Sequence, residues 1–384
     1  MKKVIIFAML ISILLVGSTR IVSAQENIIK IGFFDVLTGA EAFNGQHDRD
    51  GVLFTVDLIN QAGGILGKKI EVVVYDDRGD QLEAVNVVKR LIYEDKVSAI
   101  IGCNSSGRNI AVAPVAEEGK VPIISIIATN PRVTVPEEGK LMKYTFRVCF
   151  IDPYTGEVSA KFAMSDLGAK KAAILYEISS DYSTGVRDYF TQSWTKMGGE
   201  IVADEAFKTG DVDFRPQLTR IKGANPDVIL MPFMFPQVAL CAKQARDLGI
   251  TTTMLGGDGW DSPVLLEMAG PAVEGSYFIT HGSKDAPNVQ DFRKAFNEKF
   301  NKDIMINTIL AHDAVIMLQT AIEKAGSTNS VAIRDALESL QGLEVFTGTI
   351  NVDPKTHNPT GKAASVNKIE NNEFVFFMQF DPMK

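Results

Sequence analysis

Polar residues that could bind a charged ligand follow two apolar, strand-like runs in the first half of the chain. Ser105-Ser106-Gly107 leads from one run into a helical pattern, and Ile127-Ala128-Thr129-Asn130-Pro131 follows the next run. The start of a helix presents free backbone N–H groups and a positive dipole, which suit a carboxylate. Pro131 disfavours helical geometry at the residue before it, so the second segment should form a loop whose carbonyls and Thr129 hydroxyl face a ligand.

Different chemistry follows the strand-like runs of the second half. Tyr182 comes shortly after one such run, and Phe233 and Phe235 come shortly after another. Asp258 lies within Gly256-Gly257-Asp258-Gly259-Trp260, directly after a short apolar run. Glycines on both sides of a carboxylate allow close approach of the backbone and leave the acid exposed in a cleft.

These residues should gather in one cleft, because open parallel sheets bind ligands at the carboxyl ends of their strands. One half of the chain offers hydroxyls and a helix N-terminus, and the other half offers an acid and aromatic rings. An α-amino acid with an apolar side chain needs this combination. We expect its carboxylate at Ser106 and Thr129, its ammonium group at Asp258, and its side chain against the rings.

Each residue also has an ordinary structural interpretation. Ser106 could only cap its helix, and Asp258 could be a solvated aspartate in a turn. Phe233 and Phe235 could belong to a hydrophobic core, and Tyr182 could be a half-buried surface ring. The ligand hypothesis therefore depends on the residues acting together.

Sequence motifs for catalysis or cofactor binding are absent. The glycine-rich segment at 63–68 lacks the spacing of a phosphate-binding loop, and Lys69 stands where Ser or Thr would contact magnesium. No GxGxxG motif opens a helix after the first strand, and residues 102–107 lack the GxSxG spacing. The four histidines are scattered rather than paired for zinc. The sequence predicts a binding protein with no catalytic residue, cofactor or metal.

Apolar strand-like runs alternate with helical patterns through most of the chain. Continuous apolar strands that are each followed by a helix are typical of parallel sheets covered on both faces. The cycle occurs in two units, so the predicted fold class is α/β, with two doubly wound parallel-sheet lobes. The expected strands are 28–34, 70–75, 99–101, 121–127, 172–176, 200–203, 227–231, 254–255, 276–279, 346–352 and 374–380. The expected helices are 50–62, 82–93, 109–118, 186–197, 214–222, 238–248, 289–299 and 307–324.

The length of the chain also favours two lobes, since 384 residues exceed a single typical core. No low-complexity linker is visible, so the lobes should be joined by short crossings. The expected parts are a signal peptide at 1–24, a first lobe of 25–148 and 282–349, a second lobe of 149–281 and 350–384, and three crossings near 147–152, 281–283 and 347–353.

The N-terminus has the features of a cleavable signal peptide. Lys2 and Lys3 precede an apolar run at 4–16, and small residues lead to a cleavage site after Ala24. The run is shorter than the roughly 20 residues of a membrane-spanning helix, and no cysteine follows the cleavage site for lipid attachment. Removal of these two lysines and Arg20 changes the net charge from −8 to −11. We expect an acidic periplasmic protein that neither inserts into a membrane nor binds nucleic acid.

The cysteines indicate neither a metal site nor a disulfide framework. Cys103, Cys149 and Cys241 lack CxxC spacing, and their number is odd. Cys103 ends an apolar run, as a small buried residue would. One disulfide among the three stays open, without a preferred pair.

At these residues the sequence resembles the leucine/isoleucine/valine-binding protein family, the type I periplasmic solute-binding proteins of ABC importers for branched-chain amino acids. The likeness extends over nearly the whole mature chain, and the order and spacing of its motifs are specific although each motif is weak. The motifs are Ile31-Gly32, Leu37-Thr38-Gly39, Ile59-Asn60, Ala62-Gly63-Gly64-Ile65, Tyr75-Asp76-Asp77, Ile101-Gly102, Ser105-Ser106, Ala128-Thr129-Asn130-Pro131, Gln244-Ala245-Arg246 with Gly249, and Gly257-Asp258-Gly259.

The resemblance implies roles for residues of the first lobe. Ser106 and Thr129 match the family's carboxylate-binding serine and threonine, and Ile127 and Ala128 match the pair that contributes backbone groups. Phe43 matches an aromatic ring that covers the ligand. Ile127 is bulkier than the small residue common at its position, and it would shrink the pocket unless its side chain points away.

The resemblance also implies roles for residues of the second lobe, and a membrane permease as transient partner. Tyr182 matches the family's second-lobe tyrosine, and Asp258 matches its ammonium-binding acid. Phe235 or Phe233 takes the place of a second-lobe aromatic ring. His312 stands where relatives usually carry tyrosine, so the preferred side chain of the ligand stays open.

Other functions stay open with lower support. A soluble sensing module of the same fold would hand its ligand to a receptor, and a related importer would carry an amide, urea or aromatic acid. An enzyme would need a nucleophile, base or metal motif that the sequence lacks. A cytoplasmic repressor is disfavoured by the signal peptide and by the absence of an N-terminal DNA-binding domain.

Overall fold

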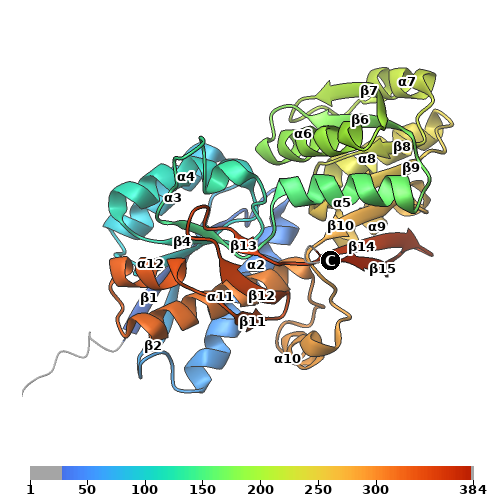
Figure 1. The fold of residues 1–384 in the computed structure, drawn as a ribbon. Coiled ribbons are helices and arrows are strands. Elements are labelled where there is room, and N and C mark those ends of the chain that lie inside the picture. Colours follow the sequence, from blue (N-terminus) through green and yellow to red (C-terminus); the bar gives the residue numbers. More distant parts are fainter. Residues whose placement is uncertain (1–27, 382–384) are drawn as a thin grey trace, which may run out of the picture.

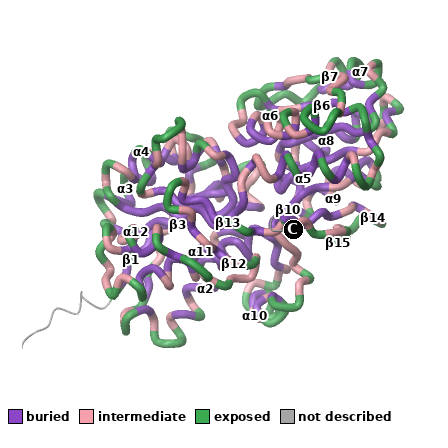
Figure 2. Tube along the Cα trace, in the orientation of Figure 1, coloured by how far each residue is buried: buried purple, intermediate pink, exposed green. Residues whose placement is uncertain are grey.

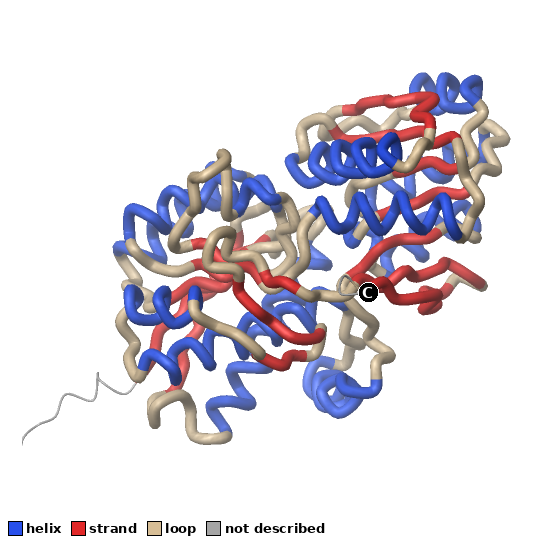
Figure 3. The backbone as a smooth tube through the Cα atoms, in the orientation of Figure 1, coloured by secondary structure: helices blue, strands red, loops and turns tan. Residues whose placement is uncertain are grey.

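The computed structural model describes residues 28–381 as two lobes, each built around its own β-sheet (Figure 1). Helices cover both faces of each main sheet (Figure 3), which confirms the predicted α/β fold class. The predicted signal peptide lies outside the described residues. Within residues 28–381, no helix is both long enough and apolar enough to cross a membrane.

The first lobe contains a five-stranded parallel sheet in the order β2-β1-β3-β4-β5. Its strands are β1 (Ile28–Asp35), β2 (Lys69–Asp76), β3 (Ala99–Gly102), β4 (Ile123–Ser125) and β5 (Thr145–Arg147). Its helices are α2 (Ala42–Gln61), α3 (Gln81–Tyr93), α4 (Ser106–Gly119), α10 (Gln290–Phe300), α11 (Ile306–Ala325) and α12 (Ser330–Glu338).

Alternating side chains of these strands form two hydrophobic cores, one on each face of the sheet. Ile31 and Phe33 of β1 pack in a core with α2, α10, α11 and α12. Phe34, the next residue along, packs on the opposite face with α3 and α4. Successive strand residues point to opposite faces, which is why a continuous apolar run becomes a strand buried on both sides. The buried strands run through the middle of each lobe in Figure 2.

The second lobe contains a seven-stranded sheet in the order β15-β14-β10-β9-β8-β6-β7. The sheet is parallel except for β14 and β15, which form an antiparallel hairpin at one edge. Its strands are β6 (Lys171–Glu177), β7 (Glu200–Phe207), β8 (Val228–Leu230), β9 (Thr253–Gly256), β10 (Tyr277–Thr280), β14 (Ala364–Glu370) and β15 (Glu373–Phe380). Its helices are α5 (Asp152–Ser165), α6 (Asp181–Lys196), α7 (Arg215–Ala224), α8 (Phe235–Asp247) and α9 (Pro263–Ala269).

The second sheet has the same two-sided burial as the first. Ala173 and Leu175 of β6 pack in a core with α7, α8 and α9. Ala172 and Ile174, which alternate with them, pack in the core that includes α5 and α6. Both sheets therefore end in loops that lie between their covering helices, the usual place for a site.

Three segments connect the lobes. The first joins β5 to α5, and the second leaves the second lobe after β10. A small three-stranded sheet of β11 (Leu343–Val345), β12 (Gly348–Val352) and β13 (Pro359–Thr360) precedes the third.

The third connection lies later in the chain than the sequence predicts. Ile350 and Val352 of β12 pack into the core of the first lobe, and β13 pairs with β12. The chain therefore returns to the second lobe at 361–363 and not at 347–353. The expected second-lobe segment of 350–384 is corrected accordingly, because the apolar residues of β12 belong with α11 and α12.

Candidate ligand-binding site

A cavity of about 210 Å³ lies between the two lobes, which corresponds to the room taken by one small molecule and a few waters. Both lobes contribute to its wall through segments that follow the carboxyl ends of their strands. Its polar and apolar lining includes Glu41, Asn44, Ser106 and Ile127 from the first lobe, and Glu177, Tyr182, Met234 and Asp258 from the second. The place predicted from strand order, at the ends of both sheets, is where the cavity lies.

Ser106 is the first residue of helix α4 and lines the cavity. Its Oγ accepts a hydrogen bond from the backbone N–H of Asn130 at 3.1 Å. The capping role belongs to Ser105, whose Oγ accepts the N–H of Arg108. Because Ser105 satisfies the helix end, the Ser106 hydroxyl and the α4 N-terminus can serve an anionic group in the cavity.

Residues 127–129 lie in the loop after β4, and only the first of them lines the cavity. Ile127 reaches the cavity wall, whereas Ala128 and Thr129 are buried behind it. The Ala128 carbonyl accepts a hydrogen bond from Arg147, and the Thr129 carbonyl accepts the N–H of Asp152. Thr129 Oγ1 is buried, and its hydroxyl faces the Asp152 carboxylate, whose pKa it lowers against the effect of burial, so its predicted ligand contact stays a prediction.

Tyr182 and Asp258 meet on the second-lobe side of the cavity. The backbone N–H of Gly259 donates to the Tyr182 hydroxyl at 3.4 Å. Burial raises the pKa of Tyr182 well above its usual value, and the neighbouring Asp258 carboxylate raises it further. Tyr182 is therefore a neutral hydroxyl beside a carboxylate at physiological pH.

The Asp258 carboxylate has two polar neighbours, His281 and Tyr182. Its Oδ2 lies 3.3 Å from Nε2 of His281, a buried residue of the second crossing. Burial lowers the pKa of His281, and the Asp258 carboxylate opposes that shift. Oδ1 of Asp258 is buried, and among the described residues the hydroxyl of Tyr182 is the neutral donor beside this carboxylate. A ligand ammonium group would add a charged donor to the same carboxylate.

Glycine is required beside Asp258 because the backbone passes close to Tyr182. A Cβ on Gly257 would lie 2.3 Å from the Tyr182 hydroxyl oxygen. The glycine therefore allows the backbone to approach another group closely, as expected. That group is the ring of Tyr182 from α6 and not a ligand.

The three phenylalanines predicted to contact the ligand do not line this cavity, in contrast to Tyr182. Phe43 packs against His47, with ring centroids 4.5 Å apart, and faces a separate cavity of about 220 Å³. Its neighbour Asn44 lines the site instead, since adjacent residues of a helix point about 100° apart. Phe233 and Phe235 are buried in the second-lobe core, as their ordinary interpretation supposed, and Met234 between them reaches the cavity.

His312 also lies away from the cavity. Its ring stacks on Phe346 with centroids 4.1 Å apart, and its Nδ1 lies 3.0 Å from an Asp313 carboxylate oxygen. Histidine in place of the tyrosine usual at this position therefore does not change the cavity wall directly.

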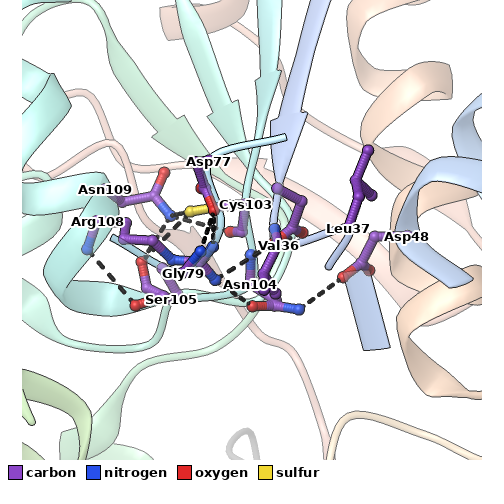
Figure 4. Close-up of polar contacts among 12 residues, drawn as sticks. Val36, Leu37, Asp48, Asp77, Gly79, Cys103, Asn104, Ser105, Arg108 and Asn109 are labelled. Carbon is purple, nitrogen blue, oxygen red and sulfur yellow. Dashed lines mark hydrogen bonds and ion pairs between the residues drawn. The ribbon is translucent and has the colours of Figure 1, made fainter. Parts of the chain in front are cut away.

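A buried polar network that the sequence did not predict supports the first-lobe wall (Figure 4). The Arg108 guanidinium forms ion pairs with Asp77 and, at 3.2 Å, with Asp35. It also donates to Asn104 at 2.7 Å, and Asn104 in turn donates to Asp48 at 3.0 Å. Burial raises the pKa of Asp48 to about 6, with hydrogen bonds to neighbouring side chains opposing the shift. This network fixes the N-terminal turn of α4, and Arg108 itself lines the cavity.

Arg108 also accounts for a cluster that could otherwise suggest a metal. Asp35, Asp77 and Cys103 bring possible ligand atoms within 4.8 Å of one another. The guanidinium already contacts both carboxylates and offsets part of their charge, so Arg108 occupies the place that an ion would take. All three cysteines lie within the described residues and are free and buried.

Comparison with known proteins links this arrangement to a family. A family model described as periplasmic binding protein matches residues 28–371. A Leu/Ile/Val-binding protein of Rhizobium johnstonii is 30% identical over 364 residues, which cover 94% of this chain and 97% of that protein.

Two solved structures have the same architecture. The leucine-binding protein LivK of Thermotoga maritima superimposes with a TM-score of 0.86 at 35% identity, covering 92% of this chain and 99% of that one. The branched-chain amino acid transporter substrate-binding protein LivJ of Streptococcus pneumoniae, solved in complex with isoleucine, gives a TM-score of 0.85 at 33% identity. That match covers 92% of this chain and all of the other.

Proposed function

The chain belongs to the periplasmic binding protein family, and we propose that it captures a free amino acid between its lobes for delivery to a membrane permease. The family expected from the sequence is thereby confirmed. The relatives named above are binding proteins, and the proposal includes no catalytic step. The transporter named for the Streptococcus pneumoniae relative supports a permease as partner.

The observation that carries the proposal is the pairing of opposite polarities across one cavity. On the second lobe, Asp258 is 7% exposed, and its neighbours among the described residues are the neutral hydroxyl of Tyr182 and the ring of His281, with no lysine or arginine paired to it. On the first lobe, the N-terminus of α4 carries Ser106 and offers backbone N–H groups. A ligand α-ammonium group would pair with the Asp258 carboxylate, and its α-carboxylate would accept hydrogen bonds at Ser106 and the N-terminus of α4. Both pairs of opposite charge would be shielded from bulk water.

Contacts between the lobes support closure around the ligand. Arg132 of the first lobe forms an ion pair with Asp181 of the second at 2.9 Å, and Asn130 donates to the Asp181 backbone carbonyl at 2.6 Å. The ring centroid of His281, which contacts Asp258, lies 3.8 Å from that of Phe150 in the first crossing. We propose that a ligand bridging both lobes stabilises this closed arrangement by rotation at the crossings.

Export is a further part of the proposal. The predicted signal peptide at residues 1–24 and the membership in a periplasmic family both support a place outside the cytoplasm. The expected absence of a lipid anchor and of nucleic-acid binding stays a prediction.

Thermal unfolding of the ligand-stripped protein in the presence of each of the twenty amino acids tests the proposal. At 100 times the dissociation constant, a ligand that binds only the folded form should add about 2.7 kcal/mol, or a rise in Tm of about 3–4 °C for a chain of this length. Acetate and methylamine carry one charged group each, and we expect them to leave Tm unchanged. Failure of every amino acid to raise Tm at millimolar concentration would rule out the function.

A further inference from the structure

Beyond the residues proposed to hold the α-amino and α-carboxylate groups, the same cavity contains a second set of polar groups. Asp258 lies with Tyr182 and His281, as described above. Glu41 and Glu177 also line the cavity, and Glu41 lies near Arg108. The ligand side chain has to share the cavity with this second set.

Glu41 immediately precedes helix α2 and contributes a carboxylate to the cavity wall. Its side chain makes no capping hydrogen bond, and no residue among 28–381 forms an ion pair or hydrogen bond with its carboxylate. Burial raises the pKa of Glu41, Arg108 opposes this shift, and Glu177 adds to it. The carboxylate therefore lies in the field of a second acid from the opposite lobe.

Glu177 is the last residue of β6 and is 8% exposed. One of its carboxylate oxygens accepts a hydrogen bond from the Thr209 hydroxyl. In the described part of the chain no lysine, arginine or histidine forms an ion pair with it. The second lobe thus adds an acid to the same cavity without adding a cation.

Arg108 cannot neutralise these two acids because its charge is already shared. Its two terminal nitrogens contact Asp77, Asp35 and Asn104. The guanidinium is therefore matched by two buried carboxylates of its own. Among the residues that line the cavity, carboxylates outnumber cations. One of these carboxylates, Asp181, is already paired with Arg132.

Asn44 gives independent support for a donor-bearing ligand. Its side chain lines the cavity and is 3% exposed. Its Oδ1 is buried and accepts no hydrogen bond from any described residue. A buried amide oxygen without a donor is unusual in a folded protein, and a ligand group that donates would satisfy it.

We propose that the amino acid bound here carries a positively charged side chain, whose guanidinium or ammonium group lies between Glu41 and Glu177 and within reach of Asn44. This inference rests on the proposed function. An apolar side chain would desolvate two carboxylates and an amide oxygen without supplying a donor, and an acidic side chain would be repelled. The preference differs from the leucine and isoleucine named for the relatives.

Calorimetric titration of the ligand-stripped protein with two matched pairs tests the inference. Citrulline has the length of arginine with a neutral end, and norleucine has the length of lysine without the ammonium group. We expect the cation of at least one pair to bind about 100-fold more tightly than its neutral partner, and leucine to bind as weakly as norleucine. In Glu41→Gln and Glu177→Gln the ratio within that pair should fall about tenfold, whereas Glu157→Gln, an exposed carboxylate paired with Lys161, should keep it.

The outcomes separate this inference from the function on which it rests. Binding of leucine or norleucine as tight as that of both cations would overturn the charged side chain but keep amino-acid capture. A large ratio that survives both substitutions would overturn the role of Glu41 and Glu177. Absence of binding by any amino acid would overturn the function itself. The matched pairs on the wild-type protein decide the main point even if a variant fails to fold.

Discussion

Replacement of Asp258 by asparagine should weaken binding of the preferred amino acid about 100-fold or more. Truncating one partner of a buried, hydrogen-bonded charge pair costs about 2–5 kcal/mol, much of it from the other charge left without a partner. The substituted side chain would keep the shape of the aspartate but present a neutral amide to the ligand ammonium group. Isothermal titration calorimetry measures the loss directly.

Asp261→Asn provides a matched control for the Asp258 substitution. Asp261 lies three residues on, lines the second cavity and accepts a hydrogen bond from the Thr280 hydroxyl at 2.6 Å. Burial raises its pKa to about 6, and the oxygen of an amide could still accept the hydrogen bond from Thr280. We expect affinity within a factor of about two of wild type there. Equal affinities of Asp258→Asn and wild type would remove Asp258 from the site.

Replacement of Arg108 by methionine should lower the free energy of unfolding by about 3–5 kcal/mol at pH 7, because breaking a buried ion pair by removing one partner leaves an uncompensated buried charge. Arg108 is 2% exposed and faces Asp35 and Asp77, which are both fully buried. Urea denaturation of the two proteins measures the difference.

The pH dependence of this loss has a defined sign. Burial already raises the pKa of Asp35 and of Asp77, and Arg108 opposes the shift for both. Without Arg108 the folded form would bind protons more tightly still, so the penalty should shrink as pH falls towards about 4. A second substitution, Asp77→Asn, should restore part of the stability at pH 7 because it removes one uncompensated charge.

Arg220→Met is the control, because it removes an arginine from an exposed ion pair and not from a buried one. Arg220 pairs with Glu205 at 2.6 Å on the surface, with its side chain 57% exposed. Exposed pairs contribute about 0–1 kcal/mol, so the control should change little. If Arg108→Met changed stability no more than Arg220→Met, the network would not be a structural requirement of the first lobe.

Much of the fold follows from sequence pattern alone. Continuous apolar runs such as those of β1 and β6 are buried on both faces, as is typical of a parallel sheet between helices. Helices with a clear apolar face, such as α3, were also predictable, and Asp80 caps α3 by accepting the N–H of Glu83. These elements depend on local sequence, so their limits agree within a few residues.

Other elements lack a local signal. Helix α5 begins at Asp152-Pro153 directly after a crossing, and buried glycine, serine and alanine residues dilute its pattern. A Cβ on Gly156 would lie 2.5 Å from the backbone nitrogen of Phe190 in α6, so the small residues reflect close helix packing. The third crossing was misplaced because strand β12 looks alike in either lobe, and only its packing against α11 and α12 assigns it.

The site was predictable where it depends on strand order. Ser106, Ile127, Tyr182 and Asp258 line the cavity because each follows the end of a strand. Phe43 was displaced by its neighbour because helix phase in the first loop could not be read from sequence.

The two acidic residues proposed to bind the ligand side chain were not predicted, for a different reason. Glu41 and Glu177 are ordinary surface residue types, and neither belongs to a motif. Arg108 owes its place to partners that are distant in the chain, namely Asp35 and Asp77. Long-range charge pairing of this kind leaves no periodic signal, although the Tyr75-Asp76-Asp77 motif already marked one partner.

A crystal structure of the protein with its tightest-binding amino acid tests the central claim most directly. We predict the ligand in the interlobe cavity, with its α-ammonium nitrogen within about 3 Å of Asp258 Oδ1 and its α-carboxylate at Ser106 and the N-terminus of α4. An amino acid bound in the separate cavity beside Phe43, or bound with its carboxylate towards Asp258, would contradict the account.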